Sequence, residues 1–127
     1  MPSKGRHYRT VVVEGFEILI GRGDAENDEL TFRVAERCDV WLHVAGGTPG
    51  SHVVIRNPEE VEVPKSVVEK AAQLAAWYSK ARAAKRVEVH VCKVGEVKKP
   101  RGAPTGTVQI DRYKSLKVQP DKLDSDE

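Results

Sequence analysis

The chain has 127 residues, of which 39% are hydrophobic and 31% are charged, and its formal net charge is +2. This length and composition fit one globular domain with a charged surface. No run of about 18 apolar residues is present, which argues against a membrane-spanning protein, and we expect no signal peptide. Cys38 and Cys92 form no CxxC pair, so we expect reduced thiols and a cytoplasmic protein.

The first predicted elements are two short strands, residues 10–14 and 16–20, which turn at Gly15. Asn27 then fits the N-cap of a short helix, because its side-chain oxygen can accept a hydrogen bond from an unpaired amide. Acidic residues follow in the first turn, where the helix dipole favours them. The apolar repeat of this helix ends near Arg37.

The middle of the chain predicts one long helix. Pro64 suits its first position, where the missing N–H costs nothing, and a broad apolar stripe continues to about Ala84. A strand of alternating valines follows, and then a glycine- and lysine-rich loop at 95–106. The valine strand comprises residues 87–92, and further strands are expected at residues 39–44, 51–56, 107–110 and 115–118.

The order of these elements predicts a single α+β domain, in which a mostly antiparallel or mixed β-sheet packs against one long and one short helix. We expect residues 8–120 to form this domain. Residues 1–7 are predicted to be a flexible N-terminus, and residues 121–127 an acidic, frayed tail.

One predicted strand carries the most informative side chains. Because side chains alternate along a strand, Asp39, Trp41 and His43 share one face. An indole can stack on a base, and an imidazole or a carboxylate can hydrogen-bond to one. We therefore expect these three residues to face outward and contact a nucleic acid. The alternative is that Trp41 packs beneath a helix, with Asp39 and His43 as a satisfied polar edge.

Candidate phosphate contacts accompany that strand. The turn 49–52, Pro-Gly-Ser-His, combines free backbone amides with a hydroxyl and an imidazole, and Arg22 and Arg56 add guanidinium groups suited to phosphate. Eight basic residues stand against two acids between Lys80 and Arg101. A cationic surface that includes an aromatic ring is typical of RNA binding. The predicted site comprises Arg22, Asn27, Asp39, Trp41, His43, Gly50, Ser51, His52, Arg56, Lys80, Arg82, Lys98, Lys99 and Arg101.

Six segments in this order resemble the NFACT-R domain, the RNA-binding domain of the NFACT proteins. They are Gly21-Arg22 with Asn27-Asp28, Asp39-x-Trp41-x-His43, Pro49-Gly50-Ser51-His52, Ala71-Ala72, Tyr78-Ser79-Lys80-Ala81-Arg82 and Val97-Lys98-Lys99-Pro100. The resemblance runs from about Tyr8 to Pro120. It implies an α+β fold and contact with tRNA on a large ribosomal subunit, in ribosome quality control, with the polar strand and the turn as the binding face.

This sequence departs from the family pattern at two points. Residues 23–26 are Gly-Asp-Ala-Glu, where the family often has a more amide-rich segment, which puts phosphate contacts there in doubt. The larger family members also carry an N-terminal domain and a coiled coil. This chain looks like a stand-alone version, so the resemblance does not imply that it synthesises tails by itself.

Two other classes of function remain open. Asp39, His43 and His52 could serve a metal-dependent hydrolase, although they lack the helical histidine spacing of common zinc motifs. A protein-interaction module would instead dock the alanine-rich helix or the basic loop on a ribosomal protein. We expect RNA, as tRNA or the large ribosomal subunit, to be the main partner, and we expect no enzyme activity, cofactor or metal.

Overall fold

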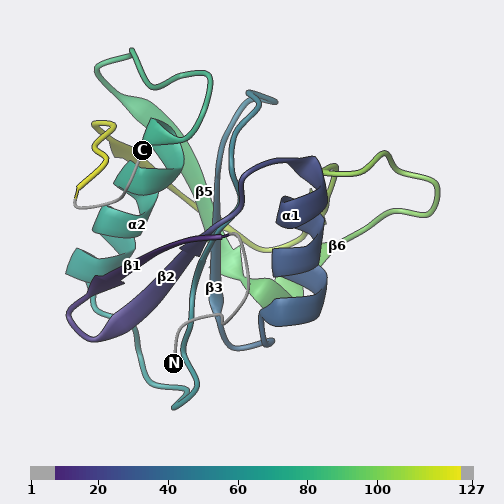
Figure 1. Cartoon of the computed structure of the whole chain (residues 1–127), viewed down its shortest axis with the longest axis horizontal. Helices are drawn as coiled ribbons and strands as arrows, with labels where there is room; N and C mark the ends of the chain where they lie inside the picture. The colour runs from purple at the N-terminus through teal and green to yellow at the C-terminus, as the bar shows by residue number, and fades with distance from the viewer. Residues whose placement is uncertain (1–7, 124–127) are drawn as a thin grey trace.

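Within residues 8–123, which the computed structural model describes, six antiparallel strands form one sheet (Figure 1). In spatial order they are β1 (Arg9–Val13), β2 (Phe16–Ile20), β4 (Val53–Ile55), β3 (Val40–Val44), β5 (Val87–Lys93) and β8 (Lys114–Val118). The expected flexible N-terminus, residues 1–7, and the last four residues of the expected acidic tail lie outside the described residues.

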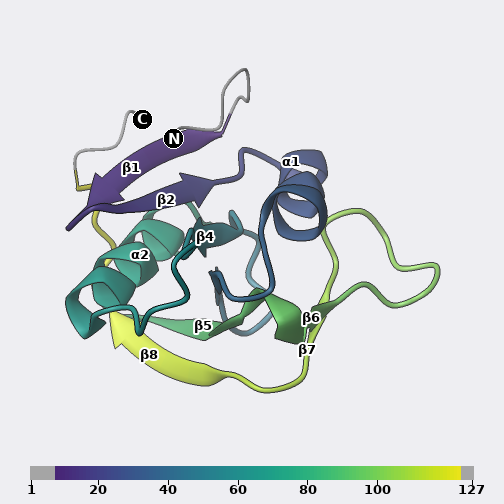
Figure 2. The same cartoon turned by 90° about the horizontal axis from the view of Figure 1, so that it is seen from below.

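Helix α2 (Lys65–Trp77) lies in the concave side of the sheet, with β1 and β2 on one side of it and β5 and β8 on the other (Figure 2). Its buried residues include Val67, Leu74 and several alanines, whose small side chains let the helix approach the sheet closely. They pack against Leu42 and Ile18 in the larger apolar core. Removing this apolar surface from water is the main stabilising contribution on this face.

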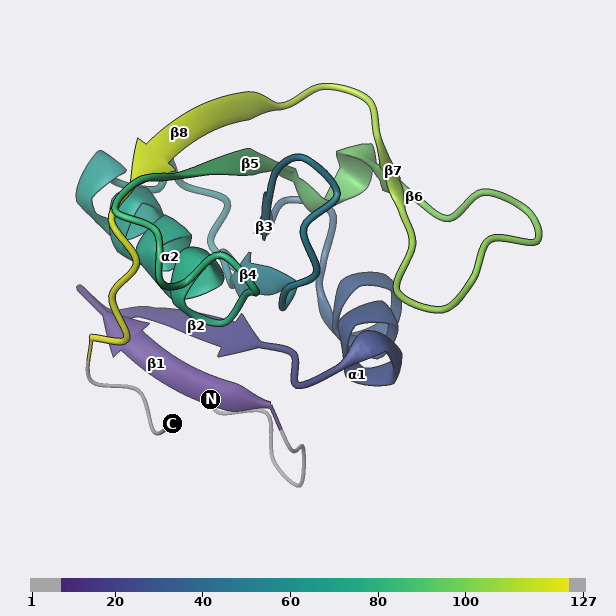
Figure 3. The same cartoon turned by 90° about the horizontal axis from the view of Figure 1, so that it is seen from above.

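A second helical segment covers the opposite face of the sheet. Helix α1 (Asp24–Glu29) continues directly into η1 (Leu30–Val34), a π-helical stretch. Leu30 packs there with Leu19 and Val54 in a second apolar cluster. A 3-10 turn, η2 (Val94–Glu96), leads to the short ladder of β6 (Val97–Lys98) and β7 (Gln109–Ile110), whose connecting loop extends past α1 (Figure 3). The sheet therefore has a buried cluster on each face.

The predicted fold class is confirmed, but the long helix is shorter than expected. It begins at Lys65, with Pro64 as N-cap, and ends at Trp77 rather than near Ala84. After Trp77 the chain leaves the helix and pairs with the loop before β4. This long-range pairing replaces the helical hydrogen bonds that local sequence favoured. None of the helices in the described part of the chain is long and apolar enough to cross a membrane.

The short helix was predicted in the right region with the wrong ends. Its N-cap is Gly23, and Asn27 is a buried residue within the helix, so the expected capping role of Asn27 is wrong. The π-helical stretch ends at Val34, three residues before Arg37.

Candidate nucleic-acid interface

Trp41 faces inward. The side chain is 2% exposed and packs with Leu19, Leu30 and Val54 beneath η1. Strand alternation does place Trp41 and Leu42 on opposite faces, as predicted. However, helical segments cover both faces, so the expected outward face is wrong. The alternative is correct for the indole, and the covering element is the short helical segment rather than α2.

His43 and His52 pack around this indole. The His43 ring stacks on Trp41 with centroids 5.8 Å apart, and His52 meets both rings edge-on at 5.1 and 5.2 Å. His52 is 1% exposed, and its Nδ1 lies 2.9 Å from Thr31 Oγ1. Burial lowers the pKa of His52 to about 3 and lowers the pKa of His43 from its ordinary value. Both rings are therefore neutral at pH 7, and His52 is not the phosphate contact that the turn suggested.

Asp39 is fully buried just before β3, and its carboxylate binds groups from neighbouring segments of the chain. Its carboxylate accepts hydrogen bonds from the backbone N–H of Asn57 at 2.6 Å and of Glu36 at 2.9 Å. Arg56 Nε lies 2.8 Å from the same carboxylate, as an ion pair rather than an aligned hydrogen bond. Arg56, which was predicted to contact phosphate, thus has an internal partner. Asp39 and Arg56 also lie at the end of β3 and β4 farthest from Gly50.

The predicted turn around Gly50 is fixed by main-chain pairing with the segment after α2. Gly50 faces Ser79 in an antiparallel bridge, and a Cβ at Gly50 would lie 2.7 Å from the Ser79 Cβ, so the approach requires glycine. The Ser51 N–H donates to the Tyr78 carbonyl and the Lys80 N–H to the Pro49 carbonyl, both at 2.9 Å. The Ser51 amide is therefore engaged in the fold and is not free for phosphate.

Asn27 ties the same turn to α1. Its Oδ1 accepts from the His52 N–H at 3.0 Å, so this amide too is engaged, and its Nδ2 donates to the Gly50 carbonyl at 3.4 Å. The Gly21 N–H donates to the His52 carbonyl at 3.0 Å, and a Cβ at Gly21 would overlap Asn27 Oδ1. Through these contacts Arg22 is brought next to the turn.

The result is a group of exposed cations at one end of the molecule. Arg22, Lys80 and Arg82 are all exposed, and they come from segments that lie far apart in the sequence. The Arg82 guanidinium lies over the Trp77 ring, 5.0 Å from its centroid. One acid is close, since Glu26 accepts a hydrogen bond from the Arg22 backbone N–H. We define the Gly50 surface as Arg22, Gly50, Ser51, Lys80 and Arg82.

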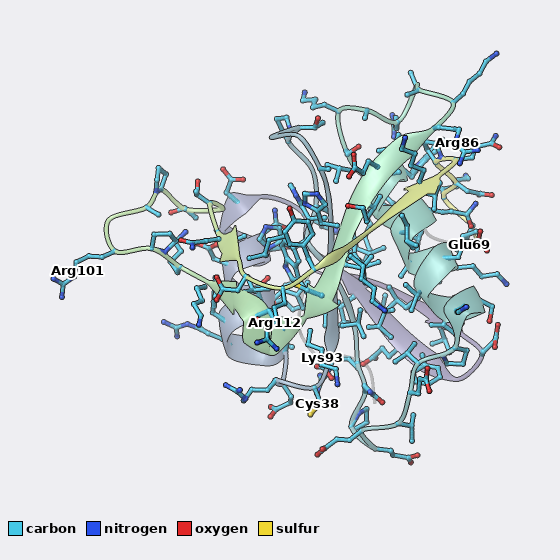
Figure 4. The ribbon with its side chains drawn as sticks, turned by 180° about the vertical axis from the view of Figure 1, so that it is seen from behind. Cys38, Glu69, Arg86, Lys93, Arg101 and Arg112 are labelled. Atoms are coloured by element: carbon cyan, nitrogen blue, oxygen red, sulfur yellow. The ribbon has the colours of Figure 1, made fainter. Side chains whose placement is uncertain are left out.

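Two of the three cations predicted to contact RNA at β6 and the loop that follows it are paired with acids. Lys98 Nζ lies 3.2 Å from Asp111, and Lys99 Nζ lies 2.9 Å from Asp28 on α1. Lys99 also donates to the Pro104 carbonyl at 2.6 Å, so it anchors the loop. Of the three predicted loop cations, Arg101 extends from the tip of the loop, away from the body (Figure 4), with no ion pair among residues 8–123.

A further group of cations was missed. Lys114 and Lys117 are exposed on β8, and Arg112 is exposed just before it, on the other side of Tyr113 in sequence and close to Lys93 in Figure 4. The signal was present, because three basic residues surround a tyrosine in residues 112–117. That segment was predicted only as a strand.

The trio that a metal-dependent hydrolase would need is not assembled. Asp39 precedes β3, whereas His43 lies near the other end of that strand, and the Asp39 carboxylate is held by amides and Arg56. Over the described range, no three side chains of His, Cys, Asp or Glu gather where they could hold a metal ion.

Known proteins share both the sequence and the fold. Residues 6–112 match the family described as NFACT protein RNA binding domain. The chain is 44% identical over 107 residues to the Rqc2 homolog RqcH of Bacillus subtilis (strain 168), covering 84% of this chain and 18% of that protein. It is 34% identical over 68 residues to ribosome quality control complex subunit 2 of Saccharomyces cerevisiae, covering 54% of this chain and 6% of that protein. The chain thus spans under a fifth of the length of these relatives.

The fold is also similar to a solved structure, that of the C-terminal part of the fibronectin/fibrinogen-binding protein from Streptococcus suis. The TM-score is 0.82 at 36% sequence identity, and the match covers 91% of this chain and 45% of that chain. The family match extends from before β1 to the residues after β7. On these grounds the chain belongs to the family of NFACT protein RNA-binding domains.

Proposed function

We propose that the chain binds RNA, and that its target is tRNA on the large ribosomal subunit during ribosome quality control. The observation that carries this proposal is the Gly50 surface, where exposed Arg22, Lys80 and Arg82 are held together by main-chain pairing. Family membership supports RNA as the ligand, and the names of the relatives support the cellular role.

Binding of this kind depends on phosphate contacts. Guanidinium and ammonium groups bind phosphate oxygens, and such contacts position a nucleic acid without reading its sequence. Trp41 and His52 are buried, so they support the shape of the surface and do not touch the RNA. Affinity should therefore fall steeply with salt, because each phosphate contact releases condensed counterions.

The protein-interaction alternative loses one of its two candidate surfaces. Ala71, Ala72, Ala75 and Ala76 of α2 are all buried against the sheet, so the alanine-rich face of the helix is not free to dock on a partner. The basic loop with Arg101 remains as a protein contact. Nuclease treatment separates the two classes, since association with ribosomal particles through protein survives trimming of the tRNA.

The test is a salt titration of tRNA binding by the paired variant Arg22→Ala/Lys80→Ala. If both side chains contact phosphate, the slope of log affinity against log salt should fall by about 2, and the affinity should drop. Lys70→Ala is the matched control, because Lys70 is exposed on α2, about 10 Å along the axis from its end, and lies outside the Gly50 surface. An unchanged slope in the paired variant, or an equal loss in the control, would contradict the proposal.

A further inference from the structure

We infer that Tyr113 and the cations beside it form a stacking site for an unpaired RNA base, an inference that rests on the RNA binding proposed above. Tyr113 lies between β7 and β8, one residue past the segment that matches the family. Its side chain is 49% exposed, whereas Trp41, the ring first predicted to stack on a base, is 2% exposed. The residue that we propose to stack on a base is therefore Tyr113, at the edge of the sheet, in place of Trp41 in its middle.

The Tyr113 ring packs against one neighbouring ring. Its centroid lies 4.3 Å from the His90 ring on β5, and the two planes are inclined by 44°. His90 supports one side of the tyrosine and leaves about half of it open to solvent. A ring that is fixed before binding loses little conformational freedom when a base stacks on it.

Cations adjoin this ring along the open edge of the sheet, where Lys117 shares its face. Alternation along β8 puts Tyr113, Ser115 and Lys117 on one face, and Arg112 and Lys114 flank the ring in sequence. All five residues are exposed. In the described part of the chain, β8 pairs only with β5, so its outer side is open to a ligand.

The nearby acids favour one path for the RNA backbone. A groove of about 1280 Å³ lies between β8 and the start of α2. Acids predominate on its helix and loop side, which carries Glu60, Glu62 and Glu69 with Lys65, and cations predominate on its strand side, which carries Lys93, Arg112, Lys114 and Lys117 with Glu96. Carboxylates repel phosphates, so the backbone follows the strand side, next to Tyr113. Two further acids adjoin that side: Glu88 on β5 is the register partner of Lys117, and Asp111, beside Arg112 in sequence, is paired with Lys98.

The combination of an exposed ring and flexible cations fits single-stranded RNA. Every base has a face that stacks on an aromatic ring, and an unpaired base is free to do so, whereas a paired base within a duplex is not. At the Gly50 surface the adjoining ring, Trp77, is only partly exposed and lies beneath the Arg82 guanidinium. We therefore assign phosphate contacts to the Gly50 surface and stacking to Tyr113.

The test measures binding of a short single-stranded RNA that contains a fluorescent adenine analogue. Tyr113→Ala should weaken binding about tenfold and abolish the fluorescence change on stacking, whereas Tyr113→Phe, which keeps the ring, should retain both. Phe32→Ala is the matched control, because Phe32 is 40% exposed on η1, away from β8. Thermal unfolding of each variant checks that the fold is intact.

The outcomes separate this inference from the proposed function. If the wild type binds tRNA and the single strand, and Tyr113→Ala binds both equally well, the stacking site is wrong while RNA binding stands. An equal loss in Phe32→Ala would also overturn the site, because the effect would not be specific to Tyr113. If the wild type binds neither RNA, both the stacking site and the proposed function fail.

Discussion

The two faces of β3 are both buried, but they are buried by different chemistry. On the α2 side, Leu42 and Val44 contact apolar side chains. On the α1 side, Trp41 and His43 pack with His52, and the polar atoms there need partners. Alternating polar and apolar residues therefore identify two faces of a strand, and they do not show which face is in water.

The polar side of β3 is held by specific hydrogen bonds as well as by burial. His52 Nδ1 pairs with Thr31 Oγ1, and the His52 N–H is bonded to Asn27. Trp41 Nε1 is buried with no hydrogen-bond partner among residues 8–123, which costs stability. The pKa values of His43 and His52 are both lowered, so the stability contributed by this side of the sheet should depend on pH. The stability contributed by the apolar α2 side should not.

The largest effect is expected from truncating the core on either side. Trp41→Ala should lower the free energy of unfolding by about 3–5 kcal/mol, and Leu42→Ala by about 2–5 kcal/mol, because each leaves a cavity. Denaturant unfolding measures both. A Trp41→Ala variant that keeps its stability but loses RNA affinity would show that the indole faces the ligand after all.

Acid should destabilise the α1 side selectively. The unfolded chain protonates His52 near pH 6.5, but the folded chain does so only near pH 3, because burial lowers the pKa of His52 to about 3. This contribution to stability is complete above pH 6.5 and is lost as the pH falls toward 3, by at most about 1.4 kcal/mol per pH unit. His43, whose pKa is also lowered, acts in the same direction.

The comparison variants are His52→Gln and Leu42→Ala, each unfolded at a series of pH values. His52→Gln should flatten the dependence of stability on pH in this range, whereas Leu42→Ala should lower stability and keep the wild-type slope. The assignment to His52 would be wrong if the glutamine variant kept the full slope.

The smallest effects are expected at the surface loop next to α1. Lys99→Ala removes a partly exposed ion pair with Asp28 and should cost about 0.5–1 kcal/mol of stability. Arg101→Ala should leave stability unchanged, because the side chain is exposed at the loop tip. Thermal unfolding compares the two, and equal effects would show that Lys99 does not anchor the loop.

Local sequence was enough to place most of the elements. Residues 16–20 were predicted as a strand with the observed ends, since their hydrophobic run is bounded by glycine on both sides. The end of α2 could not be predicted, because the pairing of Gly50 with Ser79 decides it. Residues that lie 29 positions apart carry no local sign of such a contact.

The surroundings of the predicted site residues were harder to predict than the fold, for the same physical reason. Arg22, Lys80 and Arg82, which were selected as nucleic-acid contacts, are exposed, because exposure follows from residue type and position in loops. Lys98, Lys99 and Arg56 have acidic partners that are distant in sequence or lie across the sheet. The burial of Trp41 depends on α1 and η1 folding over it, which alternation along one strand cannot reveal.

The open side of β8 matters for the state of the protein in solution. A bare strand edge can pair with the edge of another molecule, and natural sheets discourage this with charged side chains, lysine above all. Lys114 and Lys117 supply that repulsion here. Neutralising these two lysines should therefore favour edge-to-edge self-association, in addition to removing cations from the surface that we propose for RNA.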